Sequence, residues 1–91
     1  MKKFIIERNL PGAGNLTPDE LEAMSTTSNT VITMLNKSYR WIQSFVTEDK
    51  IYCIHEAESA EDIREHANCA GFPVNRIEEV KVIIDPTTVF T

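Results

Sequence analysis

The order of strand-like and helix-like segments is the feature that most constrains the fold of this chain. Four segments have the β-branched, aromatic and alternating character of strands, and two have the apolar spacing of helices. The predicted strands cover residues 3–8, 39–47, 50–57 and 76–85, and the predicted helices lie within residues 17–37 and 59–71. The predicted order is therefore strand, helix, strand, strand, helix, strand.

Both predicted helices carry recognisable end signals. Thr17 precedes a proline and Glu20, so its side chain can accept from the backbone of Glu20, and the carboxylate of Glu20 can reach back. Ser59 stands at the corresponding position of the second helix, with Asp62 where a reaching-back acid would be. Gly71 predicts the end of that helix, because glycine takes the left-handed conformation without strain.

Two split βαβ halves in this order predict a ferredoxin-like fold of the α+β class, as a single domain over residues 1–91. The expected antiparallel sheet has strand order 4-1-3-2 and carries both helices on one face. The other face needs a cover. Trp41 and Phe45 lie in an alternating strand, so we expect a second subunit to provide that cover, in a homodimer packed through its sheet faces.

Alternation assigns side chains to strand faces without saying which face meets the helices, because both faces carry apolar residues. One face of the third strand holds Ile51, Cys53 and His55, and the other holds Tyr52, Ile54 and Glu56. In the second strand, uninterrupted alternation groups Tyr39, Trp41, Gln43 and Phe45 against Arg40, Ile42, Ser44 and Val46.

Charge and segment length exclude several classes of protein. The net charge of −5 repels phosphate backbones and the nine basic residues are scattered, so we expect no nucleic-acid partner. The apolar run at residues 4–6 is too short for a signal peptide, and no segment approaches transmembrane length. We therefore expect a cytoplasmic protein without a membrane partner, whose two cysteines are free thiols.

Both histidines and both cysteines lie within residues 49–71. Neutral imidazole suits nickel, copper, zinc or iron, so His66 and His55 are candidate ligands, and the carboxylates of Glu7 and Glu65 could complete a site. The alternative is that His55 is a half-buried strand residue and His66 a packed helix residue. No two ligands stand at metal-binding spacing within one helix, so such a site would have to be assembled in space.

A pocket between sheet and helices is the other candidate site, with Trp41 and Cys53 lining it beside His66. Cys53 is interpreted first as a small buried hydrophobic residue, with a thiolate ligand as the main alternative. The chain has no paired carboxylates, no triad and no phosphate loop that would support a named reaction. Binding is therefore favoured over catalysis.

Motifs along nearly the whole chain resemble a family of short bacterial proteins of unknown function that includes a nickel-binding protein of ferredoxin-like fold. The matching segments are Phe-Ile-Ile-Glu-Arg-Asn-Leu-Pro-Gly-Ala-Gly at 4–14, Trp41 with Ser-Phe-Val-Thr at 44–47, Asp-Lys-Ile-Tyr-Cys at 49–53, Ile-Arg-Glu-His-Ala at 63–67, Gly-Phe-Pro at 71–73 and Ile-Asp-Pro-Thr-Thr at 84–88. The resemblance implies a dimeric α+β barrel that binds Ni(II) or another divalent transition metal. His66 and Cys53 are the matching positions most able to ligate it.

Overall fold

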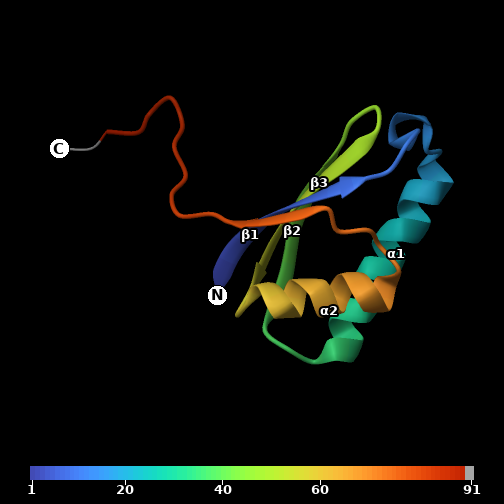
Figure 1. The fold of residues 1–91 in the computed structure, drawn as a ribbon, viewed down its shortest axis with the longest axis horizontal. Helices are drawn as coiled ribbons and strands as arrows, with labels where there is room; N and C mark the ends of the chain where they lie inside the picture. Colours follow the sequence, from blue (N-terminus) through green and yellow to red (C-terminus); the bar gives the residue numbers. More distant parts are fainter. Residues whose placement is uncertain (90–91) are drawn as a thin grey trace.

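The computed structural model describes residues 1–89, and its elements follow the predicted order (Figure 1). The strands are β1 (Lys2–Asn9), β2 (Tyr39–Val46), β3 (Lys50–Ala57) and β4 (Arg76–Glu79), and the helices are α1 (Pro18–Leu35), α2 (Ala60–Ala70) and the short 3-10 helix η1 (Ala13–Asn15). All pairings are antiparallel, in the order β2-β3-β1-β4. This is the predicted 4-1-3-2 order read from the opposite edge, so the ferredoxin-like prediction is confirmed.

The helix ends lie where the capping signals predict them. The Thr17 hydroxyl accepts from the backbone of Glu20, and the carboxylate of Glu20 accepts from the backbone of Thr17. The Ser59 hydroxyl accepts from the backbone of Asp62, and Gly71 ends α2 with a φ of 75°. The carboxylate of Asp62 accepts from Lys37 Nζ at 3.1 Å, so it ties the end of α1 to the start of α2.

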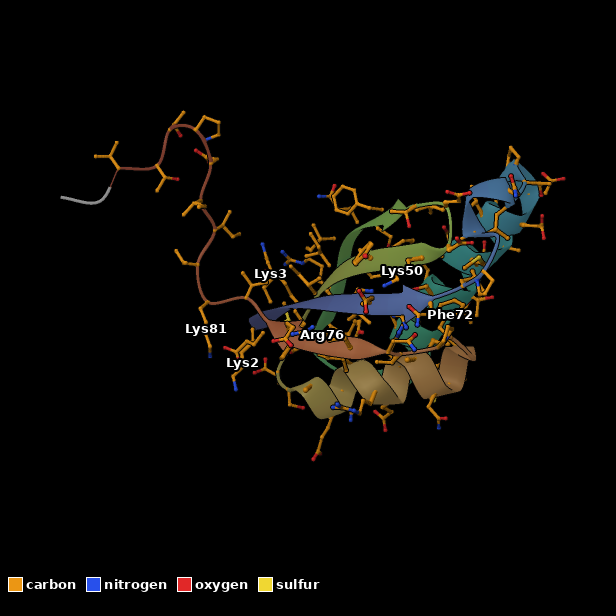
Figure 2. All side chains as sticks on the ribbon, turned by 45° about the horizontal axis from the view of Figure 1, so that its top comes forward. Lys2, Lys3, Lys50, Phe72, Arg76 and Lys81 are labelled. Carbon is orange, nitrogen blue, oxygen red and sulfur yellow. The ribbon has the colours of Figure 1, made fainter. Side chains whose placement is uncertain are left out.

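Burial identifies the sheet face that meets the helices, which the sequence pattern left open. In the two central strands every second side chain is buried, namely Phe4, Ile6, Arg8, Ile51, Cys53, His55 and Ala57. Figure 2 shows α2 lying along one side of these strands. The core forms on this side, where Ile6 and Ile63 are fully buried. Each such isoleucine contributes about 1.5–3 kcal/mol to the stability of the fold.

The side chains of β2 do not alternate without interruption, so that prediction is wrong. The pairing register shifts between Trp41 and Gln43, so Ile42 is an extra residue in this strand. A bulge of this kind moves every later side chain to the other face. Trp41 and Ser44 consequently share the helix-facing side, where the indole Nε1 of Trp41 donates to the Ser44 hydroxyl at 2.9 Å.

The last strand is shorter than predicted. The sequence pattern extends it to Asp85, whereas β4 ends at Glu79, which pairs with Phe4. One further bond joins the backbone N–H of Val80 to the carbonyl of Lys3, and β1 begins only one residue earlier. Among the described residues 1–89, no strand therefore remains to pair with residues 81–85. The chain leaves the body of the domain here (Figure 1), and Val82, Ile83 and Ile84 are exposed.

The two helices cover the sheet unequally. α2 packs against β3, whereas the main neighbour of α1 is α2. A space therefore remains between α1 and the β2–β3 part of the sheet. Within residues 1–89, no helix is long and apolar enough to cross a membrane.

Candidate functional site

A cavity of about 190 Å³ fills the space between α1 and the β2–β3 side of the sheet. It is lined by Leu21, Met24, Ser25 and Ser28 of α1, by Trp41, Ser44, Val46, Ile51, Cys53 and His55 of β2 and β3, and by Arg8, Leu10, His66, Phe72 and Pro73. An apolar cavity of roughly 150 Å³ holds a benzene molecule, so this one has room for a small organic ligand.

Exposed apolar side chains and buried polar ones both line the cavity. Val46 lines it and is 43% exposed, so the cavity reaches the surface near the end of the β2–β3 hairpin. Arg8, His55 and His66 line it and are almost completely buried. The strand register places Arg8, Ile51 and Val46 in one row across the sheet, and His55 opposite Trp41 towards the other end of the strands. A ligand in the cavity would therefore contact apolar side chains together with charged and hydrogen-bonding ones.

Three aromatic rings form a compact cluster, two of which, His55 and His66, line the cavity. The ring of Tyr39 stacks on that of His66 with centroids 5.0 Å apart, and His55 stands edge-on to both rings, at 5.3 Å from Tyr39 and 5.2 Å from His66. The Tyr39 hydroxyl and Nδ1 of His55 share a hydrogen bond of 2.5 Å. The cluster joins β2, β3 and α2.

His66 is held to α1 through one nitrogen. Its Nε2 lies 3.1 Å from the Ser28 hydroxyl and 3.4 Å from the Ser28 carbonyl, to which an Nε2–H would donate. Nδ1 of the same ring is buried and has no hydrogen-bond partner among residues 1–89. This tautomer therefore leaves the Nδ1 lone pair available.

Burial keeps both histidines neutral at physiological pH. It lowers the pKa of His55 to about 3, with smaller contributions from His66 and from the Arg8 guanidinium. Burial also lowers the pKa of His66, against an opposing effect of its hydrogen bond to Ser28. Burial raises the pKa of Tyr39, so its hydroxyl stays protonated.

Arg8 is the unusual residue of the cavity, because it is a charged side chain that is only 3% exposed. Its Nε donates to Cys53 Sγ at 3.4 Å and its Nη1 to the carbonyl of Pro73 at 2.8 Å, while the guanidinium lies 5.5 Å from the centre of the Phe72 ring. Figure 2 shows Phe72 beyond the end of α2, beside the strands. Within residues 1–89, Nη2 has no partner and no carboxylate pairs with this guanidinium.

The structure brings some of the predicted site residues together and separates others. His55, His66, Cys53 and Trp41 all line the cavity. Glu7 lies on the opposite sheet face, where Lys50 Nζ is 3.3 Å from its carboxylate. Glu65 lies on the outer surface of α2, 2.8 Å from Lys37 Nζ. The two glutamates therefore do not join the two histidines in this arrangement.

Sequence reasoning missed Arg8, Tyr39 and Ser28 as members of the site. The signal for Arg8 was present, because it alternates with Phe4 and Ile6 and so takes an apolar strand face. A charged residue on such a face is a candidate functional group. No comparable signal marks Ser28, whose role depends on its contact with His66.

Comparison with known proteins identifies the family. A family model described as "Nickel responsive protein SCO4226-like" matches residues 4–80. The chain belongs to this family. The crystal structure of SCO4226 from Streptomyces coelicolor A3(2) matches 90% of this chain and 99% of its own, with a TM-score of 0.77 and 22% sequence identity. At that identity, the match shows that the two proteins share a fold; it carries no information about a shared site. No curated protein matches the chain.

The cavity is an incomplete site for nickel in this SCO4226-like protein. It supplies two imidazoles and one thiol, and within residues 1–89 no three histidine, cysteine or acidic side chains group closely enough to hold a metal ion. The Arg8 guanidinium lines the same cavity and repels a cation. These residues fit a neutral or anionic ligand better than a divalent cation.

Proposed function

We propose that this protein binds a small molecule in the cavity between α1 and the sheet. One observation carries the proposal: a cavity larger than a benzene ring has polar atoms without partners in its lining residues, Nη2 of Arg8 and Nδ1 of His66. Buried polar groups in folded proteins are almost always hydrogen-bonded, so unpartnered ones beside a cavity support a missing ligand.

Binding rather than catalysis fits the contacts of the one thiol among the residues that line the cavity. Cys53 Sγ accepts from Arg8 Nε. A guanidinium stays protonated in proteins and cannot take the thiol proton as a base would.

The test is a cavity-filling variant read against a matched control on the same helix. Ser25 lines the cavity, whereas Thr27 is exposed. We expect protein-observed NMR with a panel of small aromatic and aliphatic compounds to shift cavity resonances, Trp41 among them. Ser25→Leu should weaken that binding and Thr27→Leu should leave it unchanged. Equal binding by both variants, or no binding to any compound, would overturn the proposal.

Transition-metal binding is the second candidate function, with nickel first. The description of the family and the 5.2 Å separation of the two imidazole rings support it. His66 and His55 would provide two ligands, and water or a second subunit the others. Binding through Nε2 of His55 would require its Nδ1–H to donate to the Tyr39 oxygen, an arrangement common in metal sites.

Calorimetry of tag-free protein with Ni(II), Cu(II) and Zn(II) tests this second candidate. If the metal ion binds at the cavity histidines, His66→Ala should abolish the heat signal. An unchanged signal in this variant, or affinity no better than millimolar, would exclude the cavity histidines as the metal site.

We further propose a cytoplasmic homodimer that packs through the open sheet face. Ile5 and Phe45 support this proposal, because both are large apolar residues on that face and are 41% and 52% exposed. Phe45→Asp should shift the sedimentation profile from dimer to monomer, whereas Val82→Asp in the extended segment should not. A wild-type protein that sediments as a monomer would contradict the proposal.

A further inference from the structure

The Arg8 guanidinium carries an inference about the class of ligand, which rests on the proposed small-molecule function. We infer that the cavity takes a small monocarboxylate with a compact apolar body, and that the carboxylate binds Arg8. Four features of the cavity support this: its charge, its free donors, its neutral histidines and its size.

The charge of the site is a single buried cation without a counter-ion. Arg8 is 3% exposed and, among residues 1–89, forms no ion pair. The Phe72 ring, at 5.5 Å, offsets only part of the cost of removing this charge from water. A ligand with one negative charge would neutralise the guanidinium inside the fold, which neither a neutral ligand nor a cation can do.

The hydrogen bonds of Arg8 leave one edge of the guanidinium for a ligand. Nε is engaged by Cys53 Sγ, and one Nη1 hydrogen by the Pro73 carbonyl. The second Nη1 hydrogen and both hydrogens of Nη2 remain, since Nη2 has no partner. Two parallel N–H groups from adjacent nitrogens match the two oxygens of a carboxylate.

The neutral histidines limit the charge of the ligand to one. His55 and His66 line the same cavity without adding positive charge. If the Tyr39 hydroxyl donates to Nδ1 of His55, then Nε2 of His55 carries a hydrogen that can donate to an anion. A phosphate dianion would find only one balancing charge here, so the site favours a monoanion.

The walls and volume define the rest of the ligand. Leu21, Met24, Trp41, Val46 and Ile51 make the cavity predominantly apolar. Its volume of about 190 Å³ exceeds the roughly 150 Å³ that holds benzene, which leaves room for a ring or branched chain plus a carboxylate. The inferred class is therefore small aromatic or branched aliphatic acids.

Two acid–amide pairs on the wild-type protein test the inference, because each pair differs mainly in charge. The probes are benzoate against benzamide and isovalerate against isovaleramide, with benzylamine as a cation, followed by NMR titration. In at least one pair we expect the acid to bind at least about tenfold more tightly than its amide, since a hydrogen bond to a charged group adds that much. Benzylamine should bind more weakly than benzoate.

The outcomes separate this inference from the function on which it rests. If the amides bind as tightly as the acids, the carboxylate inference is overturned and the small-molecule function stands. If neither the acids and amides nor the wider compound panel binds, both fail.

Variants at Arg8 then assign the preference to this residue. Arg8→Met should reduce the acid-to-amide affinity ratio to about one. Arg8→Lys should give a ratio between those of Arg8→Met and wild type, because the charge remains while the two parallel N–H donors are lost. Arg40→Met is the control, since Arg40 lies on the open face with its side chain 65% exposed. A preference that survives in Arg8→Met would overturn the assignment. If Arg8→Met does not fold, the wild-type series and Arg8→Lys still decide.

Discussion

The two faces of the same sheet hold their charged side chains in opposite environments. On the open face, Glu7 is paired with Lys50 and Glu56 with Arg40, each at 3.3 Å and in contact with water. On the helix-facing side, Arg8, which follows Glu7 in the sequence, is buried and has no ionic partner among residues 1–89. Paired surface charges cost little and contribute little, whereas an unpaired buried charge must be stabilised by something else.

This contrast shows where function is to be sought. Folding alone explains the open-face charges, since water and neighbouring ions satisfy them. Packing alone does not explain Arg8, His55 and His66 beside a cavity, because apolar residues of similar volume would fill the space at lower cost. Three predictions test the contrast.

The largest expected difference in the free energy of unfolding is between variants at two adjacent isoleucines of β1. Ile6 is fully buried on the helix-facing side, whereas Ile5 is 41% exposed on the open face. Ile6→Ala should lower the free energy of unfolding by about 2–5 kcal/mol, and Ile5→Ala by clearly less, because only the first leaves a cavity in packed core. Urea denaturation of both variants measures this, and similar losses would show that the open face is also covered.

The second prediction concerns how the stability of the fold depends on pH through a residue of the buried face. The pKa of His55 is lowered to about 3 in the folded protein, below its ordinary value of 6.5, so the unfolded chain binds more protons between these values. The contribution of His55 to the free energy of unfolding is therefore fully present above pH 6.5 and is lost as the pH decreases towards 3. This one group contributes a slope of up to about 1.4 kcal/mol per pH unit.

His55→Gln removes this titration, so its stability should depend less on pH over the same window. His66 acts in the same direction, because burial lowers its pKa too. Urea denaturation at several pH values compares the two proteins. Parallel curves for wild type and variant would mean that His55 is not buried in solution.

The smallest effect is expected on the open face. Arg40→Gln removes the ion pair with Glu56, in which the two side chains are 65% and 21% exposed. The free energy of unfolding should change by about 1 kcal/mol or less, and the change should shrink further in high salt. A larger loss would indicate that this face is buried against another subunit.

The differences between sequence and structure come from interactions beyond single segments. The bulge at Ile42 leaves no periodic signal of its own, because alternation holds on each side of it. The end of β4 depends on where β1 begins, since a strand needs a partner for its backbone groups. Arg8 carried a local signal, but its lack of an ionic partner is a property of the assembled fold.

Local patterns were sufficient to predict the order of the elements, the helix ends and the ferredoxin-like sheet, because periodicity and capping act within a few residues. The packing of distant segments decided which sheet face is buried and that His55 and His66 lie 5.2 Å apart in a cavity they share with Arg8. α1, α2 and the sheet meet only when the chain is folded. The environment that lowers the pKa of His55 and leaves Arg8 unpaired therefore exists only in the tertiary structure.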